Sequence, residues 1–526
     1  MRLAAGSALG VAAISGWGAL VERALPRREF SLAHAFLQGT VVIALLRLLL
    51  SLAGWCNPSW PLALAGAALL PLALWRAPLA RPSWLAVAAV AAGVPLALRQ
   101  LSAGIGFGDL TAIWSLHAKA LTCECALQRR FALEPCWAGT HPDYPLYLPF
   151  LHSFLFTLNA SFRDDWVKLW QSLAWLAALA ATARSMGRDS AVKGAAAVGA
   201  LLAAAAAEHG ALPFAEAFVE VNSAIFAALV ACALLDGEPA RLPLYLFGLA
   251  FTKHEGLVVA AIFVLLLALT HRRAAAATLV LLAPWLYALA HLPARHENYP
   301  ARLIDPSAWS AGLHDAPQIL AGCAARLAQL PWSLVIAAAL VATVAAVKAN
   351  RGAFTCLLAF WLACAAFFAT LVVSPWGPTL YQMTLERMFL HAYPLAAFAA
   401  IAVTPRPGKL VLAAAAAAAC IAYGLRMRAE LRPWQGADFY RRTEGWARAL
   451  RIDARVPPAA RGAVLNDSWY FHLEYTLYPR IVYPTPPEQL AGTWRPWRPW
   501  SSVPQADIDR LHLEFLLDKN RLLLLR

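Results

Sequence analysis

Charged residues are scarce in this chain. Only 14% of its 526 residues are charged and 60% are hydrophobic, whereas an ordinary soluble domain has about 25% charged residues. The mean hydropathy is +0.56. The apolar residues form repeated blocks close to the roughly 20 residues that a helix needs to cross a bilayer. This composition excludes a soluble globular protein and predicts a multispanning membrane protein.

Several motif types are also missing. The nine cysteines have no CxxC or metal-binding spacing, and neither a Walker nor a Rossmann glycine pattern is present. No repeat of constant period is visible, which argues against a transporter built from duplicated halves. Cys123, Cys125 and Cys136 share one polar loop. A disulfide from Cys136 to one of the other two is expected only if that loop faces an oxidising compartment.

The basic residues predict an orientation in the membrane. The net charge is +14, but Lys and Arg lie mainly in short loops and in the tail, which the positive-inside rule explains without a nucleic-acid partner. Pairs such as Arg272 and Arg273 mark cytoplasmic turns. Counting spans from these turns places 99-143, 293-331, 374-388 and the chain after 426 outside.

Apolar runs predict an all-α polytopic membrane bundle, with about 13 transmembrane segments, over residues 1-425. Residues 1-24 resemble a signal peptide but are expected to stay as a helix. The basic cluster at 184-193 also marks a cytoplasmic turn, so either 145-160 re-enters rather than crosses, which we favour, or this cluster is an exception to the positive-inside rule. The predicted spans are 3-21, 34-54, 60-76, 82-98, 166-184, 190-207, 221-236, 242-270 as a broken pair, 274-292, 332-347, 353-373, 389-403 and 409-425.

The last hundred residues differ in character. Residues 426-526 are richer in charge and proline, and strands are expected at 480-483 and 511-517, with a turn at 518-520. We predict a small soluble α/β domain outside the membrane. The run from Trp494 to Trp500 fits an interfacial anchor better than a sugar-stacking surface.

Two candidate clusters lie around the outer loop 99-143. Asp109 follows an early span, where partial burial can raise the pKa of a carboxylate and make it a general base. The structural alternative is that Asp109 caps the N-terminus of a helix. His141, Asp143 and Tyr144 stand in a proline-rich stretch. By itself this stretch is typical of a rigid connector.

The segment Thr252-Lys253-His254-Glu255-Gly256 interrupts an apolar run. Ionisable side chains inside a membrane cost free energy unless they form ion pairs or are hydrated. A broken helix at such a place can line a cavity. We therefore expect Lys253 to bind a phosphate. Glu255 is expected to form a salt bridge with Lys253 or to orient His254.

Further charged residues are expected on the extracytoplasmic side of the bundle. Arg387 and His391 are four residues apart, so they should share one face of a helix and form a cationic pair for a phosphate; interfacial snorkelling is the alternative. Glu220 belongs to an outward-facing polar group before a span and can supply a second carboxylate. A base opposite cations is the arrangement that sugar transfer from a lipid-phosphate donor needs.

These residues also carry a family resemblance, because their order along the chain is similar to that of the GT-C superfamily of integral-membrane glycosyltransferases. The nearest likeness is to bacterial relatives of family 39, which includes the protein O-mannosyltransferases and the aminoarabinose transferase of lipid A. The matching residues are Asp109 with Ile113-Trp114, Ala118-Lys119-Ala120-Leu121, Asp143-Tyr144-Pro145 with Pro149, Lys253-His254-Glu255-Gly256, and Arg387 with Pro394.

The resemblance implies an inverting glycosyltransferase with Asp109 as catalytic base and a polyprenyl-phosphate sugar donor. It implies a bacterial cytoplasmic membrane, membrane lipids as surroundings, and a glycan, lipid or protein acceptor on the extracytoplasmic side. The family often has Asn where this chain has His254, and many relatives have Asp near Glu220 or Asn222. Some relatives use a divalent metal, for which Asp109, Glu220 and His141 are the available ligands. A transporter or flippase of lipid-linked glycans is the alternative function.

Overall fold

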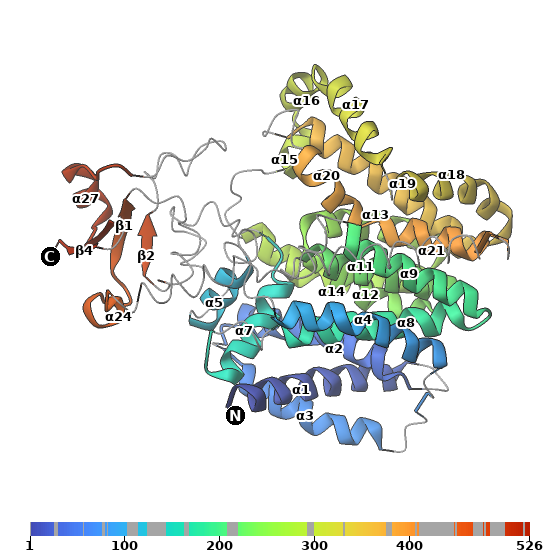
Figure 1. Ribbon diagram of the computed structural model, residues 1–526, viewed down its shortest axis with the longest axis horizontal. Helices are drawn as coiled ribbons and strands as arrows, with labels where there is room; N and C mark the ends of the chain where they lie inside the picture. The colour runs from blue at the N-terminus through green and yellow to red at the C-terminus, as the bar shows by residue number, and fades with distance from the viewer. Residues whose placement is uncertain are drawn as a thin grey trace.

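Twenty-one α-helices and one four-stranded sheet make up the described part of the computed structural model (Figure 1). The helices form a bundle, and the sheet lies to one side of it at the C-terminus. The residues that the structure describes are 2–25, 30–55, 57–75, 79–80, 83–102, 114–123, 144–162, 168–207, 219–291, 299–329, 332–374, 381–405, 408–409, 447, 450–465, 477, 480–483, 500–518 and 521–525.

The bundle starts with four long helices: α1 (Arg2–Ala24), α2 (Leu32–Leu52), α3 (Ser59–Leu74) and α4 (Trp84–Ser102). Glycines bring the first three backbones close together. A Cβ added at Gly16 would lie 1.8 Å from the Gly66 carbonyl oxygen, and one at Gly18 would lie 1.6 Å from that of Ala35. Such close approach is typical of helices that pack in lipid, where small residues replace a hydrophobic driving force.

Hydrogen bonds define two ends of the bundle. At the Ser7 end, Asn159 Nδ2 donates to Ser7 Oγ near the start of α1. At the Arg241 end, Arg241 in the short helix η4 (Pro239–Arg241) pairs with Glu22 in the last turn of α1. The helices α8 (Leu169–Gly187) and α11 (Val219–Leu235) also finish at the Arg241 end, where Ser185 Oγ donates to Asp236 at 2.5 Å.

The end of α4 and the start of α8 lie at the same level of the bundle. Ser172 at the start of α8 donates to Gln100 Oε1 at the end of α4, at 2.8 Å. Between them lie α5 (Leu116–Cys123) and the half-length α7 (Tyr147–Asn159). The Tyr147 hydroxyl donates to Thr40 Oγ1 midway along α2, whereas Asn159 reaches the Ser7 end. This geometry agrees with the predicted re-entry of 145-160.

The predicted broken pair at 242-270 is present as α12 (Leu242–Thr252) and α13 (His254–Thr270), which follow α9 (Ala191–Ala207) and α11 and precede α14 (Arg272–His291). Lys253 separates the two helices in an extended conformation, with φ −159° and ψ 163°. A Cβ added at Gly256 would lie 2.1 Å from the Leu249 carbonyl oxygen. The chain therefore folds back tightly at Lys253.

The second half of the bundle contains a break that the sequence did not predict. The predicted span 389-403 is present as α21 (Tyr393–Val403), but α20 (Tyr381–Leu390) ends before it begins, so no continuous helix carries both Arg387 and His391. Pro394 explains the break, because it has no N–H for the Leu390 carbonyl and its ring clashes with that group in a continuous helix. The preceding helices are α15 (Tyr299–Ile304), α16 (Pro306–Leu313), α17 (Ala316–Leu327), α18 (Trp332–Ala349) and α19 (Arg351–Val372).

The C-terminal sheet has the strand order β2-β1-β3-β4. Its parallel pairs join β1 to β2 and to β3, and its antiparallel pair joins β3 to β4. The predicted strand at 511-517 starts late, because α27 (Gln505–Leu511) ends at Leu511, and β1 was not predicted. The other elements are α24 (Ile452–Arg455), β1 (Arg461–Leu465), β2 (Ile481–Tyr483), β3 (Phe515–Asp518) and β4 (Arg521–Leu524).

Several helices are long and apolar enough to span a membrane. By length and composition, four described helices meet this condition, namely α1, α2, α14 and α19, and a fifth span is possible if α17 and α18, bent by 96°, count as one. Other apolar helices, such as α3 and α13, are shorter. The predicted span 409-425, most of the loop 99-143 and the cysteines Cys125 and Cys136 lie outside the described residues.

Candidate functional site

Residues from three separate parts of the chain form a buried ion-pair cluster. Lys253 Nζ lies 2.8 Å from Glu220 Oε1, and Arg387 Nη2 lies 2.7 Å from the same oxygen. Arg387 Nε also donates to it at 2.9 Å. The Glu220 side chain is fully buried, whereas 23% of the Arg387 side chain is exposed. One carboxylate oxygen therefore holds two cations, of which Arg387 is the more accessible.

Each residue of this cluster lies where a helix begins or breaks. Glu220 is in the first turn of α11, Lys253 separates α12 from α13, and Arg387 is in the last turn of α20. The backbone N–H groups at a helix N-terminus carry partial positive charge and favour anions. Helices α11 and α13 begin here, whereas α12 and α20 end here, so attraction of an anion depends mainly on the side chains of Lys253 and Arg387.

Local packing explains why Lys253 points toward Glu220. The tight reversal at Gly256 places the start of α13 against the end of α12. Thr252 Oγ1 forms a hydrogen bond of 2.6 Å with Ser223 Oγ, which joins the end of α12 to the first half of α11. The extended residue between the two helices therefore lies beside the first turn of α11.

Two further ionisable residues complete the cluster, which we call the charged junction: Glu220, Lys253, Glu255, Arg387 and His391. Glu255 Oε1 lies 3.3 Å from Lys253 Nζ, and 18% of its side chain is exposed. His391 is fully buried within electrostatic reach of the other four residues. Neither of its ring nitrogens has a hydrogen-bond partner among the described residues. The junction thus combines two carboxylates and two permanent cations with one histidine.

Aromatic rings connect the junction to the segment before α5. The Tyr144 ring centroid lies 5.1 Å from that of His254, next to Lys253 in the chain, and 5.6 Å from that of Trp114. Trp114 is 1% exposed. Asp109 stands five residues before Trp114 in the sequence but lies outside the described residues. Trp114 therefore contacts the site through the Tyr144 ring.

The structure brings together most of the predicted site residues that it describes. Lys253, Glu255, Arg387, His391 and Glu220 meet in the charged junction, and the predicted ion pair of Lys253 with Glu255 is present. Tyr144 and His254 border it. Lys119 is different: its ammonium lies 5.0 Å above the Phe162 ring beside α7. His141 and Asp143, like Asp109, lie outside the described residues.

Two expectations about the junction are wrong. Arg387 and His391 do not share a helix face, because α20 ends at Leu390 and His391 lies in the following turn. Glu220 is not in an outward-facing group before a span, since α11 already begins at Val219 and buries Glu220 completely. Its role as shared counter-ion was missed, although an acidic residue at the start of an apolar helix is itself a signal that a partner is needed.

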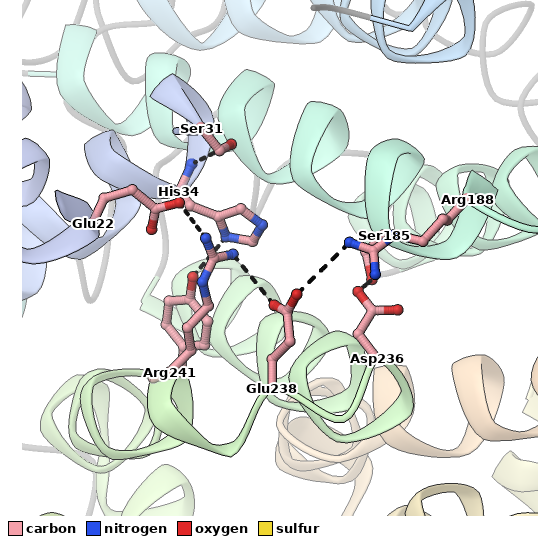
Figure 2. A network of polar contacts seen from close by, with 9 residues as sticks. Glu22, Ser31, His34, Ser185, Arg188, Asp236, Glu238 and Arg241 are labelled. Carbon is pink, nitrogen blue, oxygen red and sulfur yellow. Dashed lines mark hydrogen bonds and ion pairs between the residues drawn. The ribbon is translucent and has the colours of Figure 1, made fainter. Parts of the chain in front are cut away.

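A second polar network lies at the Arg241 end (Figure 2). Arg241 pairs with the fully buried Glu22 and lies 3.9 Å from Glu238, which in turn lies 3.7 Å from Arg188. His34 Nδ1 forms a hydrogen bond of 2.6 Å with the Tyr245 hydroxyl in α12. The short helix α12 therefore has a buried ion pair near each end, Glu22–Arg241 and Glu220–Lys253. These pairs fix its position along the bundle axis.

Asp109, Glu220 and His141 are the expected ligands if the protein binds a divalent metal. Within the described part of the chain, no group of three His, Cys, Asp or Glu residues is arranged to hold a metal ion. Glu220 itself is committed to Lys253 and Arg387. The other two residues lie outside the described part.

Comparisons with known proteins add no relative to this description. No protein-family model matches the chain, and neither a curated protein nor a solved structure does so. The functional argument therefore rests on the geometry of the charged junction.

Proposed function

We propose that the protein is a membrane glycosyltransferase that moves a sugar from a polyprenyl-phosphate donor to an extracytoplasmic acceptor. The observation that carries the proposal is the meeting of Lys253 and Arg387 at one buried carboxylate, where helices begin and break. Two clustered cations beside helix N-termini suit the phosphate of such a donor.

The reaction follows from the chemistry of that donor. The acceptor hydroxyl attacks the anomeric carbon and forms the new glycosidic bond, while the bond from that carbon to the phosphate oxygen breaks. Asp109 takes the hydroxyl proton, and polyprenyl phosphate leaves with the bonding electron pair. Attack from the opposite face inverts the anomeric centre. Lys253 and Arg387 stabilise the charge that develops on the leaving phosphate.

A lipid-linked donor requires a site within a membrane protein. Exposed tryptophans at helix ends support such a setting: Trp55 and Trp60 are 59% and 47% exposed at the start of α3, Trp75 is 67% exposed at its end, and Trp84 is 71% exposed at the start of α4. Tryptophan is enriched at both membrane interfaces. We infer a GT-C-type bundle of about 13 segments in a bacterial cytoplasmic membrane, with the charged junction and the C-terminal domain outside.

The test is transfer by the purified full-length chain in lipid nanodiscs. A panel of polyprenyl-phosphate sugars is supplied with bacterial envelope extract as acceptor, with and without a divalent metal ion, and released polyprenyl phosphate is measured. We expect Asp109→Asn to reduce release by about a hundredfold or more, the usual contribution of a general base, while donor binding persists. The matched control is Asp453→Asn, since that side chain is 94% exposed in the C-terminal domain.

The same preparation distinguishes the alternative class of function. If Asp109→Asn releases polyprenyl phosphate at nearly the wild-type rate, the catalytic role is wrong. If a lipid-linked glycan instead crosses liposomes intact and no bond is broken, the protein is a transporter or flippase. Helices that break around charged residues also occur in transporters. The liposome transport assay is therefore part of the experiment.

A further inference from the structure

Lys253 has two carboxylate partners that are held in different ways. Glu220 is fully buried, lies 2.8 Å from Lys253 Nζ and also binds Arg387. Glu255 is 18% exposed and lies farther away, at 3.3 Å. Among the described ion pairs, Glu255 takes part only in the one with Lys253. Glu255 is therefore the more weakly held of the two.

An incoming anion affects these partners unequally. Displacing Glu220 from Lys253 would separate a fully buried carboxylate from one of its two cations, and breaking a buried pair in this way is strongly unfavourable. Releasing Glu255 costs less, because a partly exposed carboxylate regains hydration and its ion pair is screened by solvent. A third anion at Lys253 would otherwise face repulsion from both carboxylates.

We infer that Glu255 occupies the position on Lys253 that the ligand phosphate takes, and that binding displaces Glu255 while Glu220 stays. The inference rests on the proposed function, since it takes the phosphate of a lipid-linked ligand as the anion. Glu220 then keeps Lys253 and Arg387 side by side, and Glu255 is an internal competitor that sets how tightly the phosphate binds.

The surroundings of Glu255 allow this exchange. Glu255 lies in the first turn of α13, where the N-terminal N–H groups stabilise a carboxylate even without Lys253. His391 is within electrostatic reach of Glu255 and has no described hydrogen-bond partner on either ring nitrogen. Because 18% of its side chain is exposed, the Glu255 carboxylate can regain hydration when it leaves Lys253.

The test measures binding of radiolabelled polyprenyl phosphate to the full chain in nanodiscs. We expect Glu255→Gln to bind about fivefold more tightly than wild type, the scale of a partly exposed ion pair. Glu255→Asp keeps the charge but is one methylene too short for the contact, so it should bind about twofold more tightly. Glu238→Gln is the matched control: its side chain is 21% exposed and it pairs with cations at the other end of the bundle.

The outcomes separate this inference from the proposed function. Equal affinities of wild type, Glu255→Gln and Glu238→Gln would overturn the displacement of Glu255 while leaving the glycosyltransferase proposal intact. Wild-type affinity in Glu255→Asp would also overturn it, because only the field of the charge would then matter. If the wild-type chain bound no polyprenyl phosphate, both ideas would be wrong.

Discussion

At the residue scale, Glu220 is the side chain that links the two cations of the site. It accepts from Lys253 and from Arg387 through one oxygen, and it is fully buried. Its burial is tolerable only because two cations surround it, since an isolated buried charge is very costly. The same carboxylate therefore stabilises the bundle and sets the spacing of the two cations.

This double role predicts a large effect of Glu220→Gln on stability. The substitution leaves two clustered cations without their shared counter-ion, and breaking a buried pair costs about 3 kcal/mol or more. We expect a clearly lower melting temperature of the purified protein in detergent. Asp453→Asn is the comparison, because the Asp453 side chain is 94% exposed and the buried Arg480 keeps its hydrogen bonds to the Val456 carbonyl, so the melting temperature should change little. Equal shifts in the two variants would contradict the structural role of Glu220.

At the element scale, short and broken helices build the site. The helix α12 has only 11 residues, and the pair α20 and α21 is broken before Pro394. In a membrane interior, such backbone ends persist only where protein or a polar cavity satisfies them. The ion pairs and the Ser223–Thr252 hydrogen bond of 2.6 Å supply that satisfaction here.

The reversal between α12 and α13 gives a prediction at this scale. In Gly256→Ala the added Cβ would lie 2.1 Å from the backbone oxygen of Leu249, so α12 and α13 must move apart and carry Lys253 away from Glu220. We expect a loss of stability of about 1–3 kcal/mol and weaker binding of polyprenyl phosphate. Gly187→Ala is the control, since its Cβ would meet only the end of the Leu85 side chain, at 2.8 Å. Wild-type binding by Gly256→Ala would show that the hairpin does not position Lys253.

At the scale of the whole molecule, polar clusters stand at two levels of the bundle. The charged junction lies where α11 begins, and the network around Arg241 lies where α11 has ended (Figure 2). Apolar helices connect the two levels. In the proposed orientation, the junction faces the extracytoplasmic side and the Arg241 end faces the cytoplasm.

Cysteine labelling tests that orientation. Asp453→Cys and Asp189→Cys replace side chains that are 94% and 78% exposed, in the C-terminal domain and just after α8 respectively. In intact spheroplasts, a membrane-impermeant maleimide should label position 453, and position 189 only after permeabilisation. The wild-type chain reports the background from its nine native cysteines. Labelling of both positions from the same side would contradict the orientation.

The sequence by itself determined where most helices lie and where one of them breaks. Long apolar runs can satisfy their backbone groups in only one way in a membrane, so spans such as 34-54 and 353-373 agree closely with α2 and α19. The charged interruption at Lys253 predicted the broken pair for the same reason. The strand β1 was harder to predict, because Gly462 and Ala463 have low strand propensity.

Only the tertiary structure decided which charges meet. Glu220 and Arg387 are 167 residues apart in the chain, and no local pattern links them. Their contact depends on how α11, α12 and α20 pack, and the half-length of α7 depends likewise on contacts with α1 and α2. Helix formation is a local property of hydrogen bonding and hydropathy, whereas the pairing of buried charges is set by the assembled bundle.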